Sequence, residues 1–98
     1  MKVIEYKDGM KLVLMVRDSG PGFDQFGVFV NGDLSFPPVS DREKHRYDID
    51  RPEGTEAVVV RFRGGDGGRS AIIDIAKDEP VLVEQQAGVT HGYLIKAV

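Results

Sequence analysis

Apolar and polar residues alternate in short runs along nearly the whole chain, and glycine, proline, asparagine and aspartate separate the runs. Alternation with a period of two places successive side chains on opposite faces, which is typical of β-strands, and turn residues between the runs mark the strand ends. We therefore expect strands within residues 2–7, 11–17, 26–31, 33–36, 47–50, 56–63, 69–76, 81–86 and 89–97.

Two of the runs are apolar at consecutive positions, at residues 12–16 (LVLMV) and 57–60 (AVVV). A strand that is apolar on both faces is typically central in its sheet, with one face on the core and the other under a loop or a partner. Short strands separated by turn signals favour two packed sheets. The pattern predicts one all-β domain over residues 1–98, an antiparallel β-sandwich of about 7–9 short strands that is immunoglobulin-like or jelly-roll-like.

Two short stretches carry strong signals for tight turns. Asp8-Gly9 lies between the first two runs, and Asn31-Gly32-Asp33 lies between the third and the fourth. The Asp-Gly and Asn-Gly pairs in these stretches favour the positive φ angles of the primed turns that close β-hairpins. We expect residues 7–10 to join the first two strands as a hairpin and residues 31–33 to form a second one.

The segment 37–46 (PPVSDREKHR) interrupts the alternation. Ser40 and Glu43 have the spacing of a capping box, and basic residues follow in the next turn, as they do in a short helix. The segment is compatible with one short helical turn near residues 41–46 or with a polar loop, and both alternatives stay open.

The glycine-rich stretch 61–70 (RFRGGDGGRS) has three possible interpretations. A phosphate-binding loop needs a helix after the glycines, but residues 71–75 (AIIDI) are strand-like. RGG-type RNA binding relies on repeated copies and positive charge, whereas this chain has one copy and is acidic. We therefore expect a hairpin loop at residues 64–69 with Phe62 opposite Ala71, because this register puts the apolar residues on one face.

Composition argues against several classes of function. The absence of cysteine excludes disulfides, thiolate metal sites and a cysteine nucleophile. The 16 acidic and 13 basic residues are spread over both halves and give a net charge of −3, which argues against nucleic-acid binding. The N-terminal segment lacks the apolar stretch of a signal peptide or a membrane span. We expect no membrane association, and a location in the cytoplasm or in an assembled particle.

Candidates for catalysis or metal binding are few. His45 and His91 each stand alone in the sequence, and no serine lies in a G-x-S-x-G context. Asp48 and Asp50 would share one face of a strand, and Asp-rich loops of a sandwich can bind Ca²⁺, but no EF-hand-type loop is present. We expect no catalytic residue, no metal site and no cofactor.

The remaining candidates are arginines and aromatic residues suited to contact with a partner. The arginines flank the glycine-rich stretch, and they form either a solvated strand edge or a contact with a carboxylate-bearing partner. The aromatic residues lie beside turns, and they either plug the end of the sandwich or contact a partner. The candidate partner-binding residues are Arg61, Arg63, Arg69, Phe23, Phe26 and Phe36.

These features favour a non-catalytic β-sandwich protein that acts through protein–protein contacts, with another protein or a second copy of itself as the partner. A small structural or accessory subunit of a larger assembly, such as a virus-particle protein or an inhibitor, would have this character. The first alternative is a ligand-binding module that uses loop aromatics to bind carbohydrate, with or without the assistance of Ca²⁺. The second is a small enzyme with a carboxylate pair.

Overall fold

The computed structural model describes residues 2–18, 25–63, 68–77, 83–84 and 91–98. Each of its strands overlaps one of the nine apolar runs, with ends that differ by up to a few residues, and no described residue is helical. The strands are β1 (Lys2–Tyr6), β2 (Leu12–Asp18), β3 (Gln25–Val30), β4 (Asp33–Val39), β5 (His45–Ile49), β6 (Thr55–Arg63), β7 (Gly68–Asp74), β8 (Val83–Glu84) and β9 (His91–Ala97).

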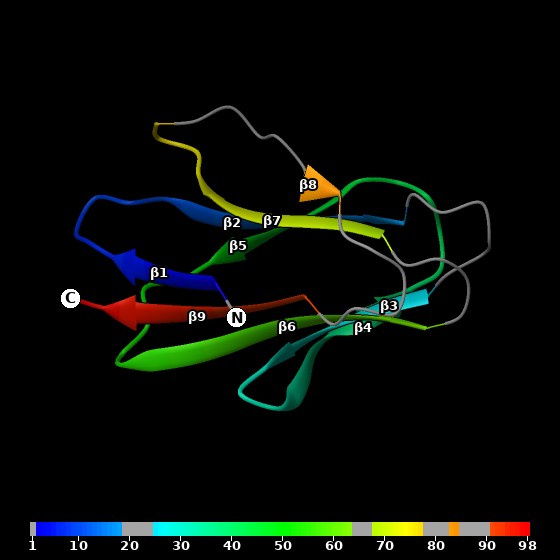
Figure 1. The fold of residues 1–98 in the computed structure, drawn as a ribbon, viewed down its shortest axis with the longest axis horizontal. Coiled ribbons are helices and arrows are strands. Elements are labelled where there is room, and N and C mark those ends of the chain that lie inside the picture. Colours follow the sequence, from blue (N-terminus) through cyan, green and yellow to red (C-terminus); the bar gives the residue numbers. More distant parts are fainter. Residues whose placement is uncertain (1, 19–24, 64–67, 78–82, 85–90) are drawn as a thin grey trace.

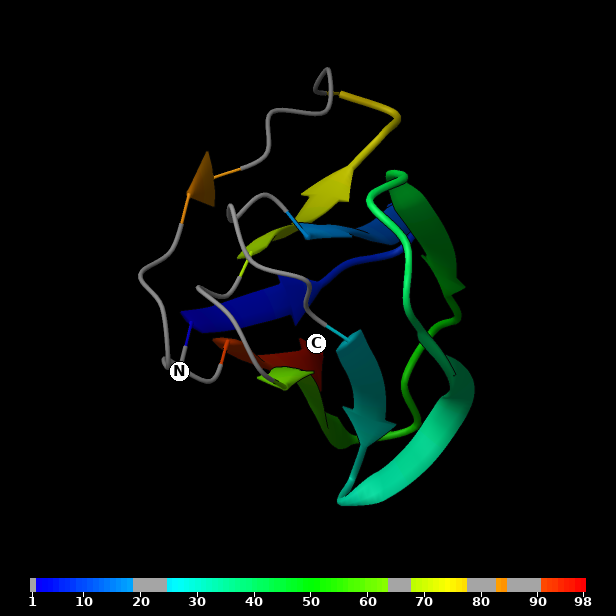
Figure 2. The same cartoon turned by 90° about the vertical axis from the view of Figure 1, so that its right-hand side faces the viewer.

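The strands form two sheets that pack face to face. One is a five-stranded mixed sheet with the order β1-β9-β6-β3-β4. The other is an antiparallel sheet with the order β5-β2-β7, and the two-residue β8 lies alongside β7. In Figure 2 the layer of β2, β5 and β7 lies above the layer that contains β9, β6, β3 and β4. The predicted all-β, sandwich-like architecture is confirmed.

The core lies between the sheets and contains the inward-facing residues of the central strands. Leu14 and Val16 of β2 pack with Val60 of β6 and Ile95 of β9, and each is 1% exposed or less. The arginines of β6, at positions 61 and 63, point to the opposite face and are exposed, as the alternation predicts.

One polar pair crosses this apolar layer. The hydroxyl oxygens of Ser70 on β7 and Tyr93 on β9 lie 2.8 Å apart, at hydrogen-bond distance, and both residues are buried. The pair joins the two sheets and gives two buried hydroxyl groups a partner that they need away from water.

The prediction of a wholly antiparallel sandwich is wrong at one edge. β1 pairs with β9 in parallel, with Lys2 opposite Tyr93 and Tyr6 opposite Ala97. Figure 1 shows the two strands side by side with their arrowheads pointing the same way. Because β1 runs beside the last strand and not beside the second, the sheet is mixed.

The prediction of a hairpin at residues 7–10 is also wrong. The chain does turn there, since the Met10 N–H donates to the Lys7 carbonyl at 3.2 Å, and Gly9 has a φ of 88°. The turn connects β1 in one sheet to β2 in the other, however, and the two strands do not pair. Gly9 alone of the two central residues has a positive φ, which fits a type II turn and not a primed hairpin turn.

The prediction of a hairpin at the glycine-rich stretch is wrong as well. β6 and β7 belong to different sheets, so Phe62 lies opposite Phe26 of β3 and Ala71 lies opposite Met15 of β2. The chain therefore passes from one sheet to the other between β6 and β7; of the expected loop at residues 64–69, Gly68 and Arg69 belong to β7, and residues 64–67 lie outside the described part of the chain. The expected register assumed that β6 and β7 pair with each other to bury their apolar faces. Each strand instead buries its apolar face as a member of its own sheet, so the assumption fails.

The segment 41–46 contains bends and the start of β5, so the helical turn is not formed and the polar-loop alternative is confirmed. Asp41 explains the difference, because its Oδ1 accepts the Glu43 N–H at 2.9 Å and lies 2.7 Å from His45 Nε2. Local side-chain bonds of this kind compete with helix formation. The hydrogen bond with His45, followed by that from Glu43, lowers the pKa of Asp41.

The second hairpin signal is confirmed. Asn31 and Gly32 join β3 to β4 with φ values of 51° and 87°, as a type I′ turn requires. The Asn31 backbone N–H donates to the Ala57 carbonyl at 2.8 Å, and its side-chain oxygen accepts the Ala57 N–H at 2.9 Å. These two hydrogen bonds anchor the hairpin to β6, its neighbour in the sheet.

Candidate functional site

The outer face of the five-stranded sheet is irregular where β3 meets β4. Phe26 lies opposite Val39 and Val28 lies opposite Phe36, so β4 has an extra residue between these pairs, and a second register shift follows. The extra length contains Pro37 and Pro38, whose backbones have no N–H to donate to a neighbouring strand. The two prolines therefore account for a bulge in β4 beside the middle of β3.

A hollow of about 530 Å³ lies on the outer face at this bulge. Most of its lining is apolar, and its polar side chains come from one residue of β3 and two of β6. The lining residues are Gln25, Phe26, Gly27, Phe29, Leu34, Pro38, Arg61, Phe62 and Arg63.

Gly27 gives the hollow its shape. A Cβ atom at this position would lie 3.2 Å from Leu34 Cδ1 and 3.2 Å from Phe29 Cε2, so a side chain would press against both residues. Leu34 is 50% exposed although it is a large aliphatic residue. An apolar side chain so accessible beside a hollow is available to a partner.

Two arginines stand along one side of the hollow. Arg61 lies opposite Gly27, and Arg63 lies opposite Gln25. The Arg61 guanidinium carbon lies 4.8 Å from the centroid of the Phe29 ring, a cation–π contact that holds the side chain over the sheet. Within the described residues neither arginine forms an ion pair with a carboxylate.

The apolar surface continues from the hollow across the same face. Val59 of β6 lies opposite Phe29, which in turn lies opposite Leu34. At the other end of the sheet, Val3 of β1 lies opposite Leu94 and is 55% exposed. We call the outer side of the β6, β3 and β4 part of this sheet, with its hollow, the contact face.

The structure separates the predicted arginines. Arg61 and Arg63 lie together on the contact face, whereas Arg69 belongs to β7 in the other sheet. Arg69 there lies opposite Arg17 of β2 and Glu84 of β8. The three arginines therefore do not form one patch around the glycine-rich stretch.

The predicted aromatic residues also have different surroundings. Phe26 is 1% exposed and contacts the rings of Phe62 and His45, each with ring centroids 5.7 Å apart, so it plugs the core beneath the hollow. Phe36 packs on Tyr47 with the ring centroids 4.6 Å apart. Phe23 lies outside the described residues.

Phe36 and Tyr47 line a second, smaller cavity of about 200 Å³. It adjoins the core residues Leu14 and Val28, and Glu56 is among its polar residues. Burial, and then the negative charge of Asp41, raise the pKa of Tyr47.

Sequence reasoning missed the residues that give the contact face its shape, chiefly Gly27, Phe29, Leu34 and Pro38. A signal for part of this set was present, because Phe26 and Val28 alternate with Gly27 and Phe29. If the first pair faces the core, the second must face outward.

The described residues contain no group of three His, Cys, Asp or Glu side chains that could hold a metal ion. No described helix is long and apolar enough to cross a membrane. Among the carboxylates, Asp74 is buried at the end of β7, and its Oδ1 accepts backbone N–H groups from Lys11 and Ala76 at 3.0 Å each. Asp74 stabilises a turn and does not face the hollow.

Comparison with known proteins gives no relative for this chain: no family model, no curated protein and no solved structure matches it. The fold defines the chain as a β-sandwich-like all-β protein, and its function has to be inferred from its surface.

Proposed function

We propose that this protein is a non-catalytic β-sandwich that acts through protein–protein contacts made by the contact face. The observation that carries the proposal is the apolar hollow at Gly27, which has the exposed Leu34 on one side and Arg61 and Arg63 on the other. The centre of a protein interface is typically apolar, and aromatic residues and arginine are enriched there. The hollow combines these features on one surface.

Two of the sheet edges, β4 and β5, are poorly suited to the addition of a strand, which supports contact through the face. β4 is an edge strand, but Pro37 and Pro38 lack donors and the bulge bends the strand. β5 is an edge of the other sheet, and Arg46 and Asp48 place opposite charges on it, 3.3 Å apart. Both features discourage the pairing of a foreign strand at β4 and β5, so a partner that binds beside the hollow is expected to lie on the face of the sheet.

The partner is another protein or a second copy of this chain, and the role is that of a small structural or accessory subunit of a larger assembly. A virus-particle protein or an inhibitor, working in the cytoplasm or within a particle, would suit such a surface. An immunoglobulin-like relationship is favoured over a jelly roll because the order β9-β6-β3-β4 resembles the G-F-C-C′ order of variable domains.

The size of the hollow gives some support to a ligand-binding module as a second candidate. Its volume of about 530 Å³ lies in the range of small-molecule sites. The Phe29 ring is the aromatic surface that a sugar would stack on, but the Arg61 guanidinium lies over it. Glycan-array binding that is lost in Phe29→Ala would favour this second candidate.

Site-specific photocrosslinking tests the proposed contact. Benzoylphenylalanine replaces Leu34 in one variant and Lys44, on the loop before β5, in a control variant, and both are expressed in cells that make the protein naturally. We expect a discrete crosslinked product from position 34 and none from position 44. No product from position 34, or the same product from both positions, would contradict the proposal.

A further inference from the structure

We propose that the partner presents an extended acidic segment to the contact face, with two carboxylates at alternate positions followed by an apolar residue. In this pattern, acid-x-acid-x-apolar, the carboxylates bind Arg63 and Arg61 and the apolar side chain packs on the apolar surface at the edge of the hollow. The inference rests on the proposed function and names the chemistry of its partner.

The spacing of the carboxylates follows from the spacing of the arginines. Arg61 and Arg63 are two residues apart on one strand, so they lie on the same face with their Cα atoms about 6.8 Å apart. An extended segment that runs along β6 has the same repeat, so residues at alternate positions face the two guanidinium groups in turn. Guanidinium and carboxylate groups are matched in shape and in charge.

The position of the apolar residue in the partner's segment is set by the next outward-facing residue of β6. Beyond Arg63 and Arg61 the strand presents Val59, which lies in the same row as Phe29 and Leu34. A side chain two residues past the second carboxylate therefore lies over Val59, next to Phe29 and Leu34, which line the hollow. Burial of an aliphatic or aromatic side chain there would provide the hydrophobic part of the contact.

The open form of the site favours a protein segment over a small molecule. Arg61, Arg63 and Leu34 border the hollow and are all exposed, so an occupant would be covered on one side only. Small-molecule sites usually bury most of their ligand. A shallow hollow is sufficient for a side chain of a partner's segment, because the backbone and the flanking carboxylates of that segment also hold the side chain in place.

Two other partners are less well matched to the site. Nucleic acid also binds arginine, but the net charge of −3 and the apolar wall disfavour a polyanion. A second copy offers Asp48 and Asp50 at alternate positions, but Asp48 pairs with Arg46, and Pro52, the next residue in the series, is buried. Both partners are separate outcomes of the test below.

The test measures binding of three synthetic peptides to the whole protein by NMR titration. The first, acetyl-STETETLTS-amide, has the proposed pattern. The second, acetyl-STEETTLTS-amide, has the same composition and charge with adjacent carboxylates, and the third, acetyl-STQTQTLTS-amide, has no charge. Exposed ion pairs are individually weak, so we expect the first peptide to bind about fivefold more tightly than either control.

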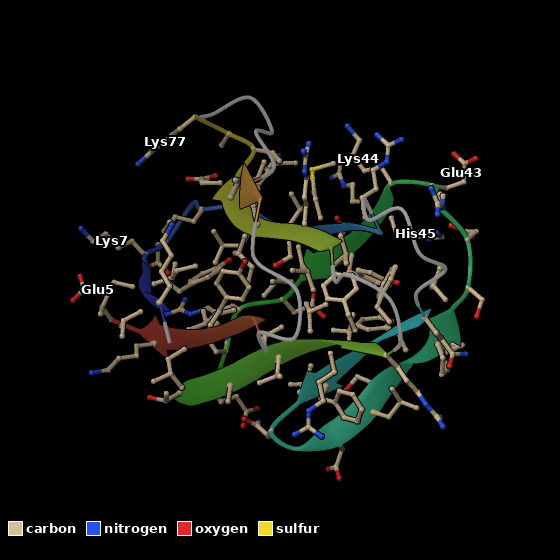
Figure 3. All side chains as sticks on the ribbon, turned by 45° about the vertical axis from the view of Figure 1, so that its right-hand side comes forward. Glu5, Lys7, Glu43, Lys44, His45 and Lys77 are labelled. Atoms are coloured by element: carbon tan, nitrogen blue, oxygen red, sulfur yellow. The ribbon has the colours of Figure 1, made fainter. Side chains whose placement is uncertain are left out.

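Charge-reversal variants locate the binding. Arg61→Glu combined with Arg63→Glu should abolish the preference for the first peptide. Lys7→Glu combined with Lys44→Glu makes the same change in net charge at two side chains that project into solvent away from β4 (Figure 3), and it should change the affinity by less than about twofold. Chemical-shift changes should fall on β3, β4 and β6.

Several results would overturn the inference. They are equal affinity for the three peptides, no binding, a preference that survives charge reversal at Arg61 and Arg63, tighter binding of a single-stranded oligonucleotide than of the first peptide, or self-association through β5. If one of these results is found while crosslinking from position 34 persists, the proposed function stands and only the acidic pattern is wrong. If crosslinking from position 34 is also absent, both are wrong.

Discussion

Gly68 is the position at which the crossing between the sheets can be tested most sharply. It begins β7, is buried, and lies opposite Asp18 of β2. A Cβ atom there would collide with the backbone carbonyl oxygen of Arg17 and with the ring of Phe62. The first belongs to the central strand of one sheet and the second to a central strand of the other. Gly68→Ala therefore forces either a strand or a core ring to move.

The cost of this substitution follows from overpacking a closely packed interior. Inserting one carbon atom into a packed core typically costs 1–3 kcal/mol, and we expect about 2 kcal/mol here because a backbone atom cannot rotate away. For a domain of this size, that loss lowers Tm by roughly 8–16 °C. Urea unfolding followed by circular dichroism measures the free energy, and a thermal scan measures Tm.

Gly54 provides the matched control. It is exposed, and a Cβ atom built on it would have no neighbour within 4 Å. Gly54→Ala should leave stability unchanged or raise it by about 0.4–1 kcal/mol, because alanine restricts the unfolded chain. If Gly68→Ala is as stable as Gly54→Ala, then β7 does not start against Arg17 and Phe62, and the close packing at the start of β7 is wrong.

Three further substitutions test other parts of the fold. Asp74→Asn should destabilise the protein at neutral pH, because the N–H groups of Lys11 and then Ala76 lower the pKa of Asp74 despite its burial, so the folded state favours the charged form. This contribution is present above the ordinary aspartate pKa of about 3.9 and is lost as the pH falls through the lower folded value, so urea titrations of the two proteins should converge in acid. Gly32→Ala places a side chain at a φ of 87° and should cost about 1–2 kcal/mol in the same assay, and equal stability would refute the type I′ turn. Ile95→Val, at a residue that is 0% exposed, should cost about 0.5–1.5 kcal/mol, and no loss would place this side chain outside the core.

The positions of the strands could be predicted from the sequence because alternation is a local property. Each run buries one face whatever its neighbour is, as Val58 and Val60 of β6 do. The choice of neighbour is not local. β6 and β7 have compatible apolar patterns and are separated by four small residues, 64–67 (GGDG), and the same pattern serves a hairpin and a crossing between sheets equally well. The parallel pairing of β1 with β9 joins the two ends of the chain, and no turn signal could reveal it.

The candidate site was predictable to a similar extent. Arg61 and Arg63 are correctly placed on an outward face, because they alternate with core residues of the same strand. Grouping Arg69 with them depended on the hairpin, so it failed when β7 proved to be in the other sheet. The hollow itself depends on the bulge in β4 opposite Gly27, which arises from the pairing of two strands and not from the sequence of either one.

The most direct test of the central claim is the affinity for the partner that crosslinks at position 34, measured by calorimetry with Leu34→Ser and Lys44→Ser. Both residues are exposed, so both variants should retain the wild-type Tm. The few side chains that dominate an interface lie near its centre and cost more than 1 kcal/mol each when truncated, so we expect Leu34→Ser to weaken binding about tenfold and Lys44→Ser by less than about twofold. Unchanged affinity in a folded Leu34→Ser protein would contradict the assignment of the contact face.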